Sequence, residues 1–211
     1  MGTNKRVETI VQQEYDRLAK IYDQRWHSYI TNTLTFLKQW AQIGSHEIVL
    51  DVACGTGEFE RLLLQDHPNQ QIVGIDVSTE MLTIAQAKLQ PYSTVTFKPG
   101  NVTALPLKDE CFDTVVCASA FHYFDCPLDA LAEMRRVLKP GGKVVILDWC
   151  KDFLLCRLCD VVLRIVDPAH KQCYTQKELQ DFLSRSQLRI KASTKLRFGA
   201  WGLMAATATK D

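Results

Sequence analysis

A run of small residues follows the first strongly apolar stretch in the middle of the chain. The apolar letters IVLDV include Asp51, and Ala53, Gly55 and Gly57 come directly after them. Glycines in such a turn remove side chains where a ligand would approach the backbone, and the N–H groups that open a following helix can bind an anion. Asp76 ends the next apolar run, where an acid can accept hydrogen bonds from ribose hydroxyls. These residues predict a cofactor loop for a ligand that contains a ribose.

The spacing of the small residues argues against two common nucleotide motifs. Dinucleotide-binding loops follow the pattern G-x-G-x-x-G/A, and counted from Gly55 the third small residue is replaced by Glu60. The G-K-[ST] sequence of a phosphate-binding loop is missing as well. NAD and nucleoside triphosphates are therefore disfavoured, and a nicotinamide oxidoreductase stays only as a distant alternative.

The elements around this loop alternate between apolar runs of strand length and helical patterns. This order implies parallel strands joined by right-handed crossovers. We expect a helix at 128–138 to end before Pro140-Gly141-Gly142. The middle of the chain is therefore predicted to be a doubly wound α/β sheet, with strands at 47–52, 71–76, 94–99, 112–119 and 143–149 and helices at 59–65, 79–89 and 128–138.

Both ends of the chain add further elements. Amphipathic helices are expected at 7–24 and 32–41, and a polar helix at 176–184 is followed by a hairpin of strands at 188–196 and 201–210. The apolar helix expected at 151–167 has three candidate roles: a lid wall over an apolar substrate, a dimer contact or a membrane-surface segment. Interfacial helices are usually rich in Lys and Arg, whereas this one balances two arginines with two aspartates, which favours the lid or core packing.

Composition limits the class of protein. The 211 residues allow one domain with a full core, and 46% hydrophobic and 23% charged residues are ordinary for a folded protein. A net charge of +1 without basic runs argues against nucleic-acid binding. No apolar stretch approaches the roughly 18 residues that cross a bilayer. We therefore expect a soluble, cytoplasmic protein without membrane insertion, either a monomer or a homodimer.

Eight cysteines raise the question of a metal site. Cys156, Cys159, His170 and Cys173 are four potential zinc ligands close in sequence. The cysteines at 156 and 159 lie three residues apart in an apolar helical run, where two such residues simply share a face. Reduced thiols packed in the core are therefore favoured, and no metal is predicted.

Five motifs in order make the chain resemble a known family, the class I S-adenosylmethionine-dependent methyltransferases of the small-molecule branch. The first, D-x-A-C-G-T-G, differs from the family's D-x-G-x-G-x-G only where Ala53 replaces a glycine. The lid-like helix with Tyr15 and Tyr22 is similar to that of quinone C-methyltransferases. The other motifs are Ile75-Asp76 with Met81, Gly100-Asn101-Val102, the segment 112–122, and R-V-L-K-P-G-G at 136–142.

The resemblance implies the fold and the domain organisation. It implies one domain over 1–211, with a Rossmann-like seven-stranded sheet of order 3-2-1-4-5-7-6 in which strand 7 is antiparallel. This domain is expected to have three parts. They are N-terminal lid helices at 1–44, a cofactor-binding core at 45–148, and capping helices with the terminal hairpin at 149–211.

The resemblance also implies which residues hold S-adenosylmethionine. Asp51 would help to anchor the methionine amino group, Asp76 the ribose, and Met81 would cover the adenine. Asn101 stands where the family usually has Asp, and keeps an acceptor for the adenine amino group through its side-chain oxygen. The full set of expected cofactor-binding residues is Tyr15, Tyr22, Asp51, Ala53, Gly55, Gly57, Asp76, Val77, Met81, Asn101, Val102 and Ala118.

The expected acceptor site lies at the carboxyl end of the fourth strand. His122 is the histidine placed there, and it is a candidate general base; a structural histidine or a pocket wall is the alternative. We expect an apolar or aromatic acceptor because Phe121, Tyr123, Phe124 and Trp149 are near this edge, with the segment 153–166 beside them.

Two functions fit these features. The first is transfer of a methyl group from S-adenosylmethionine to a small, largely apolar or aromatic acceptor. The second is a partner or sensor protein that binds the cofactor without catalysis. Tight cofactor binding without turnover over a broad acceptor panel would identify the second.

Overall fold

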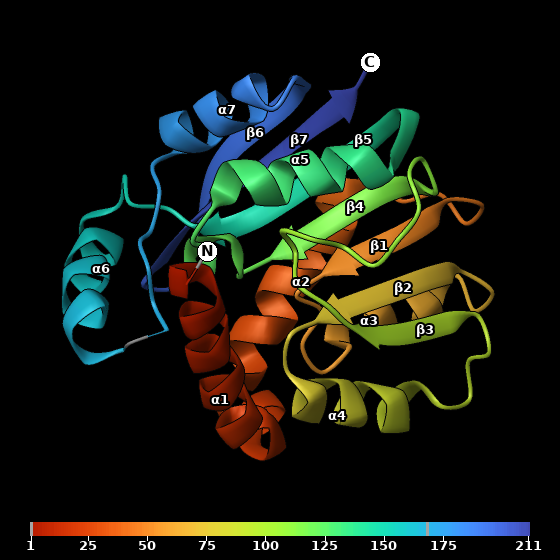
Figure 1. Cartoon of the computed structure of the whole chain (residues 1–211), viewed down its shortest axis with the longest axis horizontal. Coiled ribbons are helices and arrows are strands. Elements are labelled where there is room, and N and C mark those ends of the chain that lie inside the picture. Colours follow the sequence, from red (N-terminus) through yellow and green to blue (C-terminus); the bar gives the residue numbers. More distant parts are fainter. Residues whose placement is uncertain (1, 168) are drawn as a thin grey trace.

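The computed structural model describes residues 2–167 and 169–211, with side chains from residue 9 onward (Figure 1). The helices are α1 (Gly2–Arg25), α2 (His27–Ala41), α3 (Glu58–Asp66), α4 (Thr79–Leu89), α5 (Pro127–Val137), α6 (Leu154–Val166) and α7 (Gln176–Arg185), with a short 3-10 helix η1 (Phe121–Tyr123). The strands are β1 (Ile48–Val52), β2 (Gln71–Asp76), β3 (Val95–Pro99), β4 (Phe112–Ala118), β5 (Leu138–Trp149), β6 (Leu188–Phe198) and β7 (Trp201–Lys210).

The strands form one sheet of order β3-β2-β1-β4-β5-β7-β6, which confirms the predicted order. Strand β1 pairs in parallel with both β2 and β4, and β7 runs antiparallel between β5 and β6, as expected. The chain changes direction across the sheet between β1 and β4. In open α/β sheets, ligands bind outside the carboxyl ends of the strands at such a switch point.

Helices cover both faces of the sheet (Figure 1). On one face, Leu131 of α5 and Leu179 of α7 are fully buried in one apolar cluster. On the other, Leu37 of α2, Leu63 of α3 and Leu82 of α4 belong to a second cluster. Because successive strand residues point to opposite faces, the strands contribute to both clusters. Burial of these side chains holds the strands, and therefore the strand ends that carry the site, in fixed positions.

Helix α2 begins five residues earlier than predicted, at His27. The segment after Trp26 contains β-branched residues of low helix propensity, which is why the sequence favoured a later start. In the structure, the Trp26 N–H donates to Tyr22 O and the Ile30 N–H donates to Trp26 O, so α1 and α2 are joined almost continuously. Burial of Ile30 and Thr33 stabilises this first turn.

Strand β5 also begins earlier than predicted, at Leu138 instead of residue 143. Leu138 pairs with Phe112, and the pairing then shifts before Lys143 meets Thr114. Pro140-Gly141-Gly142 therefore lies in an irregular entry to the strand and not in a separate turn.

All eight cysteines are free, as expected. Cys156 Sγ contacts the backbone N–H and C=O of Gly202 at 3.3 and 3.2 Å, so it packs α6 against β7. Among the described residues, the group with metal-ligand geometry is Asp160, His170 and Cys173, without Cys156 or Cys159. Of the described helices, none is long and apolar enough to cross a membrane.

Candidate functional site

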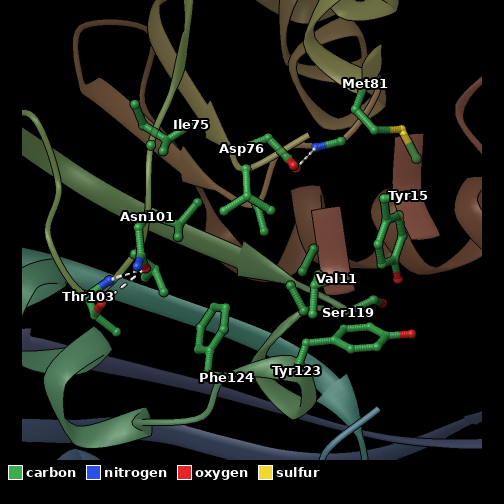
Figure 2. A pocket seen from close by; sticks show the side chains of 18 of the residues that line it. Val11, Tyr15, Ile75, Asp76, Met81, Asn101, Thr103, Ser119, Tyr123 and Phe124 are labelled. Carbon is green, nitrogen blue, oxygen red and sulfur yellow. Dashed lines mark hydrogen bonds between the residues drawn. The ribbon is translucent and has the colours of Figure 1, made fainter. Parts of the chain in front are cut away.

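A cavity of about 130 Å³ lies at the carboxyl ends of β1, β2 and β4. Figure 2 shows Met81, Tyr15 and Tyr123 along one side of it and Asn101 and Thr103 along the other. Ten of the twelve residues expected to bind the cofactor line it: Tyr15, Tyr22, Ala53, Gly55, Asp76, Val77, Met81, Asn101, Val102 and Ala118. We call this cavity the nucleoside pocket.

Asp76 is the buried acid of the nucleoside pocket. Its carboxylate accepts the N–H of Gly55 at 2.8 Å and the N–H of Ser78 at 2.8 Å. Burial raises the pKa of Asp76, and these N–H bonds oppose that rise by stabilising the charged form. Asp76 therefore ties the loop after β1 to the end of β2 and keeps lone pairs for hydroxyl donors in the pocket.

The loop between β1 and α3 uses left-handed backbone at several positions. Gly55 has φ +55°, and a side chain added there would meet no atom within 4 Å, so the missing side chain leaves open space at the pocket. Gly57, at φ +78°, does not line the pocket; its Cα faces Ala85 and Leu89 of α4 and serves the turn into α3. Ala53 also has φ +60°. Replacing the family's glycine there therefore costs backbone strain in addition to the added methyl group.

Met81 and Asn101 line opposite sides of the nucleoside pocket (Figure 2). Met81 is buried, and its N–H donates to the capping Ser78 Oγ at 3.1 Å. Asn101 Oδ1 accepts the Thr103 N–H at 2.9 Å and the Thr103 hydroxyl at 3.1 Å (Figure 2). The side-chain oxygen that was expected to serve the adenine amino group is therefore already engaged by its own loop.

Helix α1 closes the nucleoside pocket with two tyrosines. The rings of Tyr15 and Tyr22 are 6.0 Å apart, and Tyr15 meets Tyr123 edge-on at 5.5 Å. Burial raises the pKa of Tyr22 to about 12, so its hydroxyl is neutral at physiological pH.

Acidic residues of α1 attach it to the rim of the pocket. Asp16 accepts the Ser78 hydroxyl at 2.6 Å, and Asp23 accepts the Thr56 hydroxyl at 2.5 Å. Lys88 of α4 also pairs with Asp23 at 2.7 Å. The helix is thus bonded to both the glycine loop and α4.

A second hollow of about 70 Å³ lies next to the nucleoside pocket and contains Asp51, the other expected residue that does not line the first. Asp51 is 2% exposed, and its Oδ1 has no hydrogen-bond partner among the residues that the structure describes. Burial and the nearby Glu60 raise the pKa of Asp51. We call this hollow the acid pocket, because an unpaired carboxyl there would favour a cationic group.

The third and largest cavity, of about 400 Å³, lies between α1, α6 and the end of the sheet. Its walls are aromatic and aliphatic: Tyr15, Leu18, Tyr22, Trp26, Tyr29, Tyr123, Trp149, Leu158, Val162, Leu163 and Trp201, with Glu14, Ser119, His122, Cys159 and Asp167 among them. Trp149 and Trp201 stack at 4.7 Å. We call this the aromatic cavity.

His122 lies in the wall of the aromatic cavity and is held by Asp148 of β5. Asp148 Oδ1 lies 2.6 Å from His122 Nδ1, and Asp148 Oδ2 accepts the His122 N–H at 2.8 Å. The imidazole also stacks on Trp149 at 5.1 Å. The ring is therefore fixed with Nδ1 on the carboxylate, which orients Nε2 as the remaining nitrogen.

One expectation about this region is wrong. Phe121, expected near the acceptor edge, is fully buried against Tyr174 and Phe182 in the core. His170, one of the four potential zinc ligands in the sequence, is buried as well and bonds Asp160 at 2.9 Å.

Helix α6 forms part of the cavity wall, which fits the expected lid role. Leu158, Val162 and Leu163 line the aromatic cavity, whereas Leu154 and Ile165 are each 80% exposed. Only one side of this helix, which carries Cys156 and Asp160, is buried in the core.

The sequence did not reveal several residues that line the cavities. Tyr29 accepts the Trp149 Nε1–H at 2.8 Å and shares a 2.8 Å hydrogen bond with Ser119. Ser119 has φ +52°, an uncommon conformation for a non-glycine residue at the end of β4. Tyr29 and Trp201 lie in no recognisable local motif, whereas Ser119 lies in the segment 112–122, just after a strand, and that position could have drawn attention to it.

Comparisons with known proteins agree with this geometry. Residues 50–146 match a protein family described as "Methyltransferase domain". The demethylmenaquinone methyltransferase of Deinococcus radiodurans is 42% identical over 102 residues, covering 48% of this chain and 42% of that protein. The one of Symbiobacterium thermophilum is 32% identical over 161 residues, covering 69% of this chain and 61% of that protein. The chain thus spans less than two thirds of these relatives' length.

Solved structures share the fold at low identity. A SAM-dependent methyltransferase from Thermotoga maritima superposes with a TM-score of 0.77 at 21% identity, covering 95% of this chain and 100% of that one. One from Aquifex aeolicus gives 0.72 at 23% identity, covering 92% and 97%. Residues 50–146 therefore match a methyltransferase domain, and the motifs and strand order of the chain are similar to those of class I S-adenosylmethionine-dependent methyltransferases.

Proposed function

We propose that the protein transfers a methyl group from S-adenosylmethionine to a small, largely apolar or aromatic acceptor. The observation that supports this most is that Tyr22 and Ser119 line all three cavities. A donor that spans the nucleoside and acid pockets would therefore have its reactive centre where the aromatic cavity begins. Direct transfer needs mainly a nucleophile held about 3–3.5 Å from that centre, so placement supplies most of the catalysis.

The residues of the two smaller pockets fit the cofactor. Asp76 would accept the ribose hydroxyls, and Met81 and Val102 would enclose the adenine. The unpartnered Asp51 Oδ1 suits the α-ammonium group of the amino-acid end. When bound, the cofactor supplies an electrophilic methyl group on a sulfonium, and the protein supplies its orientation and a closed surface from α1.

His122 is the proposed general base. An acceptor oxygen or carbon that forms a bond to the methyl group must lose a proton, and His122 Nε2 would take it. Asp148 would accept a hydrogen bond from Nδ1–H, which fixes the tautomer that leaves Nε2 free to take the proton. Asp148 is a positioning residue in this scheme.

A phenolic or quinol ring is the acceptor class that we favour. The cavity volume of about 400 Å³ lies in the range of roughly 300–1,000 Å³ typical of small-molecule sites, and its walls carry tryptophan and tyrosine rings that stack on planar ligands. The relatives are named for demethylmenaquinone, whose reduced, quinol form is such a ring.

The test is a methyl-transfer assay with labelled S-adenosylmethionine. Short-chain naphthoquinols, simple phenols, thiols and amines would be supplied in parallel to the wild type and to His122→Gln. The proposal predicts labelled product from the aromatic hydroxyl compounds and its loss in His122→Gln, at unchanged cofactor affinity. Binding of the cofactor without labelled product from any acceptor would instead support a non-catalytic binding protein.

A further inference from the structure

Glu60 is a buried carboxyl whose position the proposed reaction does not explain. It lies on α3, is 0% exposed, and neither of its oxygens has a hydrogen-bond partner in another described residue. Burying such a group without partners is costly, so native proteins rarely keep one without a function. It shares its helix face with Leu63 and Leu64, where an apolar residue would pack without this cost.

The charge of Glu60 acts on the Asp51 carboxyl of the acid pocket. Asp51 Oδ1 is likewise buried and unpartnered among the described residues, so the two carboxyls together have three such oxygens. The charge of Glu60 disfavours ionisation of Asp51, because two like charges in a dry site repel. Burial raises the pKa of Glu60 to about 8 and raises the pKa of Asp51 as well.

The groups around the pair leave it with an excess of negative charge. Those that act on the two carboxyls are Asp76 of β2, Glu58 of α3 and Lys88 of α4, and the thiols of Cys54 and Cys117 lie beside them in their neutral form. Lys88 is the cation of this set, and its ammonium is already bonded to Glu58 and Asp23. Tyr29, which faces the acid pocket from α2, is also neutral because burial raises its pKa. The two carboxyls therefore cannot both be charged at low cost until another cation arrives.

We propose that Asp51 and Glu60 form a proton-linked receptor for an organic ammonium group: the pair holds one proton when the acid pocket is empty and releases it when the ammonium enters. This rests on the proposed function, in which the ammonium is that of the cofactor's amino-acid end. One positive charge enters as one proton leaves to solvent, so the charge of the site is unchanged. Glu60 acts through Asp51 and is a positioning residue.

The proposal makes cofactor affinity depend on pH. Binding coupled to the loss of one proton strengthens by up to about tenfold per pH unit while the pair is protonated, that is between pH 6 and 8. A ligand without the ammonium, such as 5′-methylthioadenosine, should show no such dependence, because it leaves the acid pocket unfilled.

Calorimetry in two buffers of different ionisation enthalpy counts the protons directly. S-adenosylhomocysteine at pH 7 should release about one proton per chain from the wild type, and 5′-methylthioadenosine close to none. Glu60→Gln should release close to none with S-adenosylhomocysteine. Asp66→Asn is the matched control on the same helix, and it should still release a proton because Asp66 is exposed and its ion pair with Lys38 lowers its pKa.

Each remaining outcome counts against a different claim. Equal proton release by Glu60→Gln and the wild type, or binding by the wild type without release, would overturn the inference and leave the proposed function intact. Absence of any binding by folded wild-type protein would overturn the proposed function, and the inference with it. If Glu60→Gln does not fold, the wild type still decides, because an affinity that is flat from pH 6 to 8 contradicts proton release.

Discussion

The nucleoside pocket and the aromatic cavity are neighbours built in different ways. The nucleoside pocket takes its shape from backbone turns after β1, β2, β3 and β4, with Gly55 and Asp76 joined by one hydrogen bond, and α1 closes it. The aromatic cavity takes its shape from side chains on α1, α2, η1, β5, α6 and β7. Trp26 and Trp201 line the same cavity although 175 positions separate them (201 − 26).

This difference explains how one fold can keep the same binding site for the methyl donor while its binding site for the acceptor changes. A pocket made by short turns at a switch point depends on few residues and changes little when the surface changes. A cavity walled by side chains from many elements can be reshaped by single substitutions. Substitutions in the two regions should therefore separate cofactor binding from acceptor recognition.

The largest effect is expected at His122. Replacing it with Gln should lower kcat for an acceptor that loses a proton by about 10²–10⁴-fold, because a positioned base typically contributes that much. The dissociation constant of S-adenosylmethionine should stay within about twofold, since His122 lines only the aromatic cavity of the three. Steady-state rates and calorimetry measure the two quantities. A weakened cofactor affinity with normal kcat would break the separation of the two regions.

A smaller effect, on the other region, is expected at Asp76. Asp76→Asn should weaken S-adenosylmethionine binding by roughly 10- to 100-fold, because a hydrogen bond to a charged acceptor contributes about 1.5–3 kcal/mol. Asp181→Asn on the exposed side of α7 is the matched control and should bind normally. Unchanged affinity in Asp76→Asn, measured by calorimetry, would show that the nucleoside pocket is assigned to the wrong ligand.

Trp201 tests whether acceptor binding can be changed without changing cofactor binding. Trp201→Ala removes a ring that stacks on Trp149 and should raise the KM of an aromatic acceptor by roughly tenfold, for a loss of about 1–2 kcal/mol of apolar contact. The KM for S-adenosylmethionine should be unchanged. If both KM values rise together, the two cavities are not independent.

The smallest effect concerns stability and has a definite sign with pH. The pKa of Glu60 is raised from its ordinary value of 4.5 to about 8, so the folded state binds more protons than the unfolded state between these values. Stability should therefore fall as pH rises from about 4.5 to 8. Glu60→Gln should unfold with a free energy higher by on the order of 1 kcal/mol at pH 9 and no higher near pH 4. Urea titrations at both pH values measure this, and an equal change at both would exclude titration of Glu60 as the cause.

The sequence predicted the cofactor half of the molecule much better than the acceptor half. The loop from Asp51 to Gly57 and the acid at Asp76 are contiguous motifs, and the alternation of elements implied the sheet that brings them together. Tyr29, Trp149 and Trp201 became neighbours only because β5 pairs with β7 and α2 packs on that part of the sheet, which no short pattern specifies. Contacts of this kind must be found in a structure.

Glu60 is an intermediate case. Its type was noticed only because it broke a dinucleotide motif, yet its spacing from Leu63 and Leu64 already places it on the apolar face of a helix. An acidic residue on the apolar face of a helix is expected to be buried, and Glu60 is fully buried in the structure. The left-handed backbone of Ala53 and Ser119 had no comparable signal, since neither residue type favours it.

The central claim is that the pockets beside α1 hold S-adenosylmethionine. Calorimetric titration of the folded protein, freed of any co-purified nucleoside, with S-adenosylmethionine and separately with S-adenosylhomocysteine tests it most directly. The account predicts one site per chain for each ligand, with micromolar dissociation constants. Absence of binding by both ligands would contradict the account and assign the glycine loop to a different ligand.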